Sequence, residues 1–254
     1  MVLKFDITVP PLTGGRMRKA FIYLPVGYGE QNRRYPVMYM FDGQNLFSNE
    51  DATYGKSWGL ADYLDFTETP LIIAGVECNT QGNGRLSEYS PIDFTTPFGE
   101  NIKGRGKEYM DWLVHEFKPY IDENFATLPD RENTAIGGSS LGGLMTLYAI
   151  SEYGKYFSKG AALSPSIWVD SVSALPVLTA ADYRKDTVIY MDYGSLEFTD
   201  DSPQKQLFAD TCAHFIQKDV CLTSRIILGG THCEASWEKQ IPFFMHTLGF
   251  FPRR

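Results

Sequence analysis

The chain has 254 residues, of which 43% are hydrophobic and 21% charged, and its formal net charge at pH 7 is −8. This length and composition are typical of a globular α/β protein, and we expect residues 1–254 to form a single domain. The acidic balance excludes the basic face that phosphate backbones require, so we expect no nucleic-acid partner.

The N-terminal sequence, the lengths of the apolar runs and the cysteine content indicate a cytoplasmic protein. The first residues lack the apolar core of an export signal, and no apolar run approaches the roughly 18 residues of a membrane span. We therefore expect no membrane partner. The four cysteines, Cys78, Cys212, Cys221 and Cys233, form no CxxC pair and are too few for a disulfide scaffold. We expect them to be reduced.

Three apolar segments in the first third of the chain have the length of buried strands: Lys19–Pro25, Tyr35–Phe41 and Pro70–Glu77. Continuous apolar runs of this kind are typical of parallel strands covered on both faces. Farther along, apolar residues recur with the i, i+3, i+4 spacing from Lys107 to about Asn124. This spacing predicts a helix with one buried face.

The second half of the chain alternates between the two kinds of element. We predict strands at Asn133–Gly138, Lys159–Pro165, Asp186–Gly194 and Leu222–Leu228, and helices at Leu141–Tyr153, near Lys205–Gln217 and after His232. Strands that alternate with helices predict an α/β fold with a mainly parallel sheet and helices on both faces. In such sheets the active site lies at the carboxyl ends of the strands.

A glycine-rich segment between a predicted strand and a predicted helix carries the first catalytic signal. Gly138-Ser139-Ser140-Leu141-Gly142 fits the pattern G-x-S-x-G with Ser140 at its centre. Small residues two positions before and after Ser140 permit the sharp turn that would expose its hydroxyl. We predict that Ser140 is a nucleophile, whereas Ser139 would point into the turn.

A serine nucleophile requires a general base, and the chain offers four histidines. Three of them, His115, His214 and His246, fall inside helical patterns. His232 instead follows the last predicted strand through a glycine-rich loop, where the chain order serine, acid, histidine places the base. We therefore predict His232 as the base.

The acid that orients this histidine must lie between Ser140 and His232 and follow a strand. Asp192, Glu197, Asp200 and Asp201 are available. Glu197 lies on a glycine-led loop just past a strand, from which it can return toward His232. We predict Glu197 as the acid, with Asp192 as the alternative.

An oxyanion formed during acyl transfer requires backbone N–H donors. One candidate is the amide of Leu141, at the start of the helix that follows Ser140. The other is the amide of Gln44, or alternatively Gly43, in the turn Phe41–Phe47 after an early strand. The glycine permits an unusual backbone conformation at this turn.

With these motifs the sequence resembles the putative-esterase family of α/β-hydrolases, which includes enterochelin-esterase-like proteins, feruloyl esterases and S-formylglutathione hydrolases. The matching segments are YLPVGYG, YPVMYMFDGQ, GRLSEYSP, GGSSLGG, GAALSPSIW, GSLE and GGTHCEASW. The resemblance implies the α/β-hydrolase fold, the triad Ser140, Glu197 and His232, oxyanion donors at Gln44 and Leu141, and no metal or cofactor. It implies a serine carboxylesterase acting on small or aromatic acyl esters.

The residues around these motifs leave several readings open. Aromatic side chains at Trp58, Tyr89, Trp168 and Trp237 are candidates for lining a substrate pocket or for packing beneath loops. Arg85 and Glu88 could form a structural ion pair or contact substrate. An acyltransferase on the same fold would share the acyl-enzyme step, and a binding protein on a hydrolase scaffold is the non-enzymatic alternative.

Overall fold

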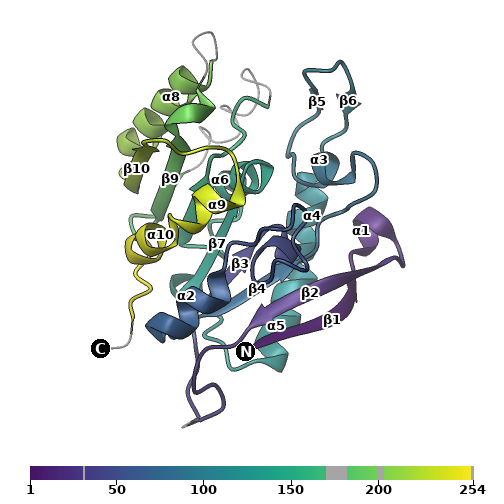
Figure 1. The fold of residues 1–254 in the computed structure, drawn as a ribbon, viewed down its shortest axis with the longest axis vertical. Helices are drawn as coiled ribbons and strands as arrows, with labels where there is room; N and C mark the ends of the chain where they lie inside the picture. Colours follow the sequence, from purple (N-terminus) through teal and green to yellow (C-terminus); the bar gives the residue numbers. More distant parts are fainter. Residues whose placement is uncertain (31, 170–181, 199–202, 253–254) are drawn as a thin grey trace.

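A computed structural model of the chain describes residues 1–30, 32–169, 182–198 and 203–252 (Figure 1). Within them an eight-stranded sheet has the order β1-β2-β4-β3-β7-β8-β9-β10. Its strands are β1 (Val2–Thr8), β2 (Met17–Tyr23), β3 (Val37–Met40), β4 (Ile72–Val76), β7 (Thr134–Ser139), β8 (Lys159–Leu163), β9 (Val188–Gly194) and β10 (Cys221–Ile227). All pairs from β4 to β10 are parallel, whereas β1 pairs with β2 and β2 with β4 in antiparallel fashion.

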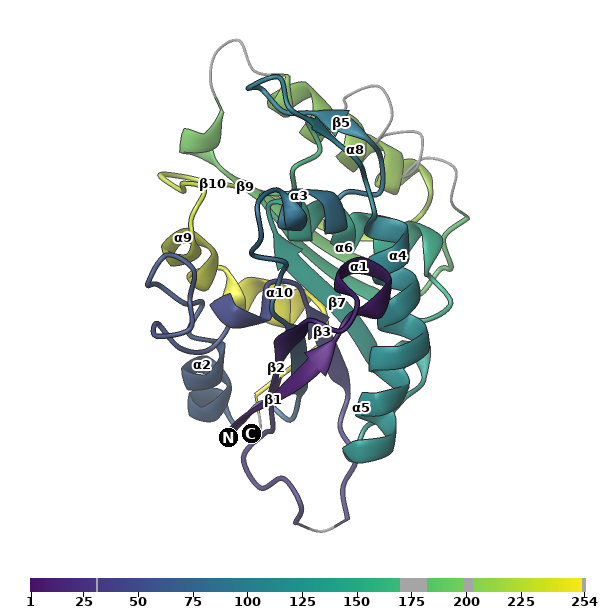
Figure 2. The same cartoon turned by 90° about the vertical axis from the view of Figure 1, so that its right-hand side faces the viewer.

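Helices cover both faces of this sheet (Figure 2). They are α1 (Pro10–Thr13), α2 (Leu60–Thr67), α3 (Gly84–Glu88), α4 (Gly106–Trp112), α5 (Lys118–Asn124), α6 (Leu141–Glu152), α8 (Gln204–Gln217), α9 (Glu234–Glu238) and α10 (Ile241–Thr247). A short hairpin of β5 (Phe94–Thr95) and β6 (Asn101–Ile102) lies apart from the sheet.

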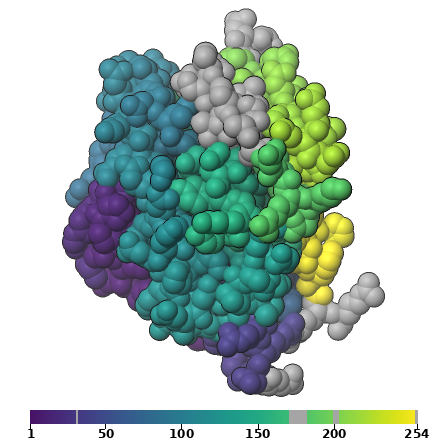
Figure 3. Space-filling view, turned by 180° about the vertical axis from the view of Figure 1, so that it is seen from behind, coloured from purple at the N-terminus to yellow at the C-terminus, as the bar shows by residue number. Residues whose placement is uncertain are grey.

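The hydrophobic core is divided by the sheet into two clusters. Buried side chains of α4, α6 and α8 belong to one cluster, and those of α2, α9 and α10 belong to the other. From behind, residues from the middle of the chain occupy the centre of the surface (Figure 3). The α/β fold with a mainly parallel sheet is therefore confirmed. Among the described helices, none combines the length and the apolar character needed to cross a membrane.

The predicted helix from Lys107 to Asn124 forms, but one π-helical turn interrupts it at Leu113–Phe117. Pro119 follows two residues after this turn. A proline within a helix has no N–H for the i−4 carbonyl, and its ring collides with that carbonyl. Widening the preceding turn accommodates the proline without ending the helix.

The carboxyl ends of the six parallel strands meet along one edge of the sheet. Asp42 and Gln44 follow β3, Arg85 lies on α3 after β4, and Ser140 follows β7 directly. The remaining three strands contribute Ser164 after β8, Glu197 after β9 and His232 after β10. Residues far apart in the sequence therefore converge where parallel sheets form their active sites.

Candidate active site

Ser140 lies at a strained turn between β7 and α6. Its φ of 59° and ψ of −125° are rare for a residue with a side chain. The turn requires glycine on both sides, because a Cβ on Gly138 would come within 2.9 Å of the Gly142 backbone. The Ser140 hydroxyl lies 3.3 Å from that of Ser166 and lines a cavity. A strained turn between a strand and a helix, with glycine on both sides of the serine, is the geometry that the G-x-S-x-G pattern predicts.

The turn after β3 carries the predicted amide of Gln44. It forms a short 3-10 helix, Gly43–Asn45, that packs directly on β4, where a Cβ on Gly43 would lie 2.7 Å from the Gly75 backbone. The Gln44 side chain is held away by hydrogen bonds with Thr53 and with Cys78. Among the described residues, no backbone carbonyl accepts a hydrogen bond from the amides of Gln44 or Leu141. Both amides therefore remain available to a ligand.

His232 and Glu197 are in direct contact. His232 Nδ1 and Glu197 Oε2 are 2.6 Å apart, and the Glu197 side chain is 7% exposed. The other oxygen, Oε1, accepts hydrogen bonds from the Gly194 amide and the Ser164 hydroxyl, both at 2.7 Å. Burial disfavours the charged form, but the hydrogen bonds from His232, Ser164 and Gly194 outweigh it and lower the pKa of Glu197. The carboxylate is therefore ionised at neutral pH.

Ser164 connects this carboxylate to the tryptophan that packs against the imidazole. The Trp237 indole N–H donates to Ser164 Oγ at 3.0 Å, while Ser164 donates to Glu197. The Trp237 and His232 rings meet edge to face, with centroids 5.1 Å apart. Ser164 is buried and has a φ of 42°. Sequence reasoning missed Ser164, although it follows β8 as Ser140 follows β7.

Asp192, the alternative acid, is buried, and its hydrogen bonds are with Tyr190 and Ser164. Its Oδ2 accepts a 2.6 Å hydrogen bond from the Tyr190 hydroxyl, and Oδ1 lies 3.4 Å from the Ser164 amide. It is 1% exposed. Burial raises the pKa of Asp192 to about 6, although the hydrogen bonds from Tyr190 and Ser164 oppose the shift. The other two alternatives, Asp200 and Asp201, lie outside the described residues.

The raised pKa of Asp192 predicts a pH-dependent stability. A carboxyl whose pKa is higher in the folded than in the unfolded chain stabilises the fold below its unfolded pKa, and this contribution is lost as pH rises through the folded value. Between about pH 4 and pH 7, Asp192→Asn should therefore gain up to about 3 kcal/mol of unfolding free energy relative to the parent chain. Denaturant titrations of both proteins at several pH values measure this difference. A difference in unfolding free energy that does not change with pH would contradict the raised pKa of Asp192.

Two cavities meet at His232. The first, of about 620 Å³, is lined by Ser140, His232 and Gln44 together with Asp42, Asn45, Thr53, Tyr54, Cys78, Asn79, Thr80, Gly82, Arg85, Cys233, Glu234 and Trp237. The second, of about 510 Å³, is lined by Pro97, Ser164, Trp168, Tyr193, Glu197, Pro203, Gln204 and His232. We call them the nucleophile cavity and the aromatic cavity. Ser140 lines the nucleophile cavity, and His232 lines both.

The four aromatic pocket candidates divide into two pairs. Trp237 lines the nucleophile cavity and Trp168 lines the aromatic cavity. Trp58 and Tyr89 line neither of these cavities, and both are buried in the core. The pocket role predicted for these two is therefore corrected. Trp58 packs on Trp237, and the Tyr89 hydroxyl accepts a hydrogen bond from the Asp42 amide, so both support residues of the cavity from behind.

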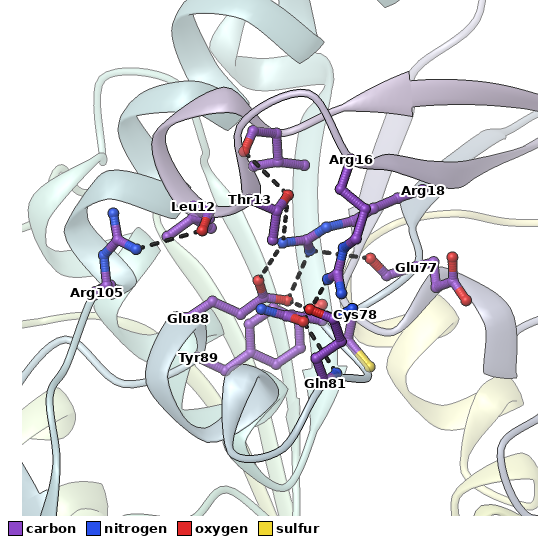
Figure 4. A network of polar contacts seen from close by, with 12 residues as sticks. Leu12, Thr13, Arg16, Arg18, Glu77, Cys78, Gln81, Glu88, Tyr89 and Arg105 are labelled. Atoms are coloured by element: carbon purple, nitrogen blue, oxygen red, sulfur yellow. Dashed lines mark hydrogen bonds and ion pairs between the residues drawn. The ribbon is translucent and has the colours of Figure 1, made fainter.

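Arg85 and Glu88 do not pair with each other, so the ion pair that the sequence left open as one alternative does not form between them. Glu88 forms a two-pronged, fully buried pair with Arg18, at 2.9 and 2.7 Å (Figure 4). Arg85 leaves the same short helix in another direction and donates from Nε and Nη2 to Asp42, both at 2.7 Å. Arg18 lies on β2, 70 residues before Glu88, so a local sequence pattern does not indicate this pair. The Arg85–Asp42 pair fixes the turn that carries Gln44.

The remaining histidines lie where their helical patterns predicted, His115 in the π-helical turn, His214 in α8 and His246 in α10. In the described part of the chain, no three His, Cys, Asp or Glu side chains converge in a way that could hold a metal ion. All four cysteines are unpaired. The described residues at the sheet edge include a serine, a histidine, several carboxylates and the amides of Gln44 and Leu141.

The protein has the α/β-hydrolase fold, with a serine at the turn after the central strand β7. The model of the family described as "Putative esterase" matches residues 13–242. The chain belongs to that family, and the resemblance inferred from its motifs is confirmed. It is an esterase and thus a hydrolytic enzyme.

The chain is also similar to individual proteins. The uncharacterized protein YbbA of Bacillus subtilis is 28% identical over 187 residues, which cover 71% of the chain and 69% of YbbA. An endo-1,4-beta-xylanase/feruloyl esterase of Xylanibacter ruminicola is 31% identical over 138 residues, covering 52% of the chain and 17% of that enzyme. Among solved structures, an IroE-like serine hydrolase from Shewanella oneidensis superposes with a TM-score of 0.77 at 22% identity. The superposition covers 97% of this chain and 79% of the hydrolase.

Proposed function

We propose that this esterase is a serine carboxylesterase that hydrolyses small or aromatic acyl esters through an acyl-enzyme. Its catalytic triad is Ser140, His232 and Glu197, and its oxyanion hole consists of the amides of Gln44 and Leu141. The observation that carries the proposal is the 2.6 Å contact between His232 and Glu197 at the cavity that Ser140 lines from its strained turn.

Acylation follows from these roles. His232 removes the proton from Ser140 as the hydroxyl attacks the ester carbonyl, and the Gln44 and Leu141 amides stabilise the negative oxygen of the tetrahedral intermediate. His232 then gives this proton to the departing alcohol. Glu197 remains ionised, holds the imidazole through Nδ1 and stabilises its positive charge. Water, activated by His232, releases the acid in the second half of the reaction.

The substrate class rests on the shape and chemistry of the cavities. The nucleophile cavity, of about 620 Å³, has room for an aromatic acyl group beside Ser140, and Trp168, Tyr193 and two prolines give the aromatic cavity flat apolar walls for the alcohol half. The similarity to a feruloyl esterase supports an aromatic ester. The test is a series of p-nitrophenyl esters of increasing acyl length together with methyl ferulate. Turnover of none of these esters, or turnover that survives Ser140→Ala, would overturn the proposal.

Ser164 is a positioning residue in this mechanism. Ser164→Ala removes one of three hydrogen bonds to Glu197 and leaves the Trp237 indole N–H without its acceptor. A hydrogen bond to a charged group contributes about 1.5–3 kcal/mol, so kcat/KM should fall roughly 10- to 100-fold. The loss of a donor to Glu197 should also raise its pKa and move the acid limb of the rate profile to higher pH. Steady-state rates from acid to neutral pH measure both effects.

Ser158→Ala is the matched control for this variant. Ser158 is also a buried serine and precedes the other end of β8, and its hydroxyl has no partner among the described residues. It should keep the parent rate and the parent profile. Equal behaviour of the two variants would show that Ser164 serves the core rather than Glu197.

We also propose that the protein acts in the cytoplasm on small-molecule esters, without a nucleic-acid or membrane partner. The four unpaired cysteines support a reducing compartment. Fractionation of the native host with detection of the protein in each fraction tests this location.

A further inference from the structure

Glu234 is a buried carboxyl that lines the nucleophile cavity and has no role in the proposed mechanism. It is the first residue of α9, two positions after His232, and it lines the cavity together with Ser140. The residue is 7% exposed. Apart from its own backbone amide, its hydrogen-bond donor among the described residues is Asn45 Nδ2, at a long 3.5 Å from Oε1.

No cation in the described structure pairs with this carboxyl. Arg85 lines the same cavity, but both oxygens of Asp42 already occupy its Nε and Nη2. Burial raises the pKa of Glu234 and Asp42 adds to this effect, whereas Arg85 and His232 oppose it. A buried carboxyl without a strong donor is costly, and a donor on a ligand would relieve that cost.

The position of the reacting atoms indicates which half of the ester reaches Glu234. The acyl carbon must contact the Ser140 hydroxyl and its oxygen must face the Gln44 amide, and both residues line the nucleophile cavity. The departing oxygen must instead reach His232, which also borders the aromatic cavity. Ser140 and Gln44 line the nucleophile cavity and not the aromatic cavity, so we assign the acyl half to the cavity that contains Glu234 and the alcohol half to the cavity beside Trp168.

We propose that Glu234 recognises a hydrogen-bond donor, an ammonium or a hydroxyl group, on the acyl half of the substrate. The inference rests on the proposed function and narrows its substrate class to amino- or hydroxy-substituted acyl esters. Asn45 holds the carboxyl from the other side, because its own Oδ1 is fixed by the Thr53 amide at 2.9 Å and its Nδ2 thus faces Glu234. An acyl group with a carboxylate would meet a like charge and bind poorly.

The test compares p-nitrophenyl benzoates that carry a methyl, hydroxymethyl, aminomethyl or carboxylate group at the 3- or 4-position. These acyl groups differ little in size, and the two positions sample the distance from Ser140 to Glu234. We expect kcat/KM for the better hydroxymethyl or aminomethyl isomer to exceed that of the methyl ester at least about tenfold. The carboxylate ester should be the slowest. The hydroxymethyl and aminomethyl arms distinguish a neutral from a charged donor.

Glu234→Gln should reduce the aminomethyl-to-methyl ratio to about one and raise the relative rate of the carboxylate ester. Glu238→Gln is the matched control, because Glu238 lies on the same helix but pairs with Lys56 at the surface. It should keep the ratios of the parent chain. The corresponding phenylboronic acids, tested as inhibitors of p-nitrophenyl acetate hydrolysis, give the same ratios as binding constants and cover benzoates that turn over slowly.

Flat ratios in the parent chain by both measurements, or ratios that Glu234→Gln leaves unchanged, would overturn the inference. The proposed function fails in a different way, since hydrolysis of p-nitrophenyl acetate would then persist in Ser140→Ala. Hydrolysis that depends on Ser140 but shows flat ratios removes the role of Glu234 and leaves the triad intact.

Discussion

Ester hydrolysis should fall by about 10⁴-fold or more when Ser140 is replaced by alanine, while the fold stays intact. The three triad residues act as a unit, so the loss of the nucleophile removes the acyl-enzyme route altogether. Alanine retains the Cβ, and the strained backbone at φ 59° therefore changes little. Glycine would relieve that strain and confuse the comparison. Turnover of p-nitrophenyl acetate and thermal unfolding of both proteins measure the two parts of this prediction.

Ser139→Ala is the control next to it in the sequence. Ser139 is the last residue of β7, is buried, and pairs with Leu163 of β8. Its replacement should leave most of the activity. Mass spectrometry after exposure to a fluorophosphonate should locate the label on Ser140. Activity that survives in Ser140→Ala and disappears in Ser139→Ala would move the nucleophile by one residue.

Much of the fold could be predicted because parallel strands buried on both faces are continuous apolar runs. The run Ile72–Val76 is buried at every position, as its composition indicates. The strand Val2–Thr8 was missed, although its polar and apolar residues alternate. It lies at the antiparallel edge of the sheet and is only partly buried, so its pattern is weaker than that of the central strands. A strand that is buried on both faces can therefore be predicted from the sequence more readily than a strand at the edge of the sheet.

The side chains that support the site were harder to predict, because their partners come from other strands. Ser164 lies 33 residues before Glu197, and Asp42 lies 43 residues before Arg85. Only the convergence of strand ends brings them together, and a local pattern does not report it. For the same reason, Arg85 and Glu88 have separate partners although they lie three residues apart. Glu88 pairs with Arg18 on β2, whereas Arg85 pairs with Asp42 in the turn after β3. Composition likewise does not separate a core aromatic such as Tyr89 from a cavity aromatic such as Trp168.

Glu197→Gln should slow hydrolysis by roughly 10²- to 10⁴-fold, and the surrounding contacts explain why an isosteric change would be so damaging. The Oε1 side of Glu197 faces two donors, the Gly194 amide and the Ser164 hydroxyl. A glutamine must place its oxygen there, which turns its NH₂ group toward His232. His232 Nδ1 then becomes an acceptor, and its proton moves to Nε2. In that tautomer the imidazole cannot accept the proton of Ser140, and the negative charge that stabilised the imidazolium is also gone.

Asp192→Asn, measured on the same ester, tests whether Glu197 is the right carboxylate. The asparagine side chain would keep an acceptor for the Tyr190 hydroxyl or the Ser164 amide, and neither contact involves the imidazole. We expect a loss below about tenfold, since only the backbone of Ser164 would be disturbed. A large loss in Asp192→Asn beside a nearly normal Glu197→Gln would assign the acid to Asp192. The 2.6 Å contact between Glu197 and His232 would then have to be a resting arrangement that substrate binding replaces, and Ser140 and His232 would keep their roles.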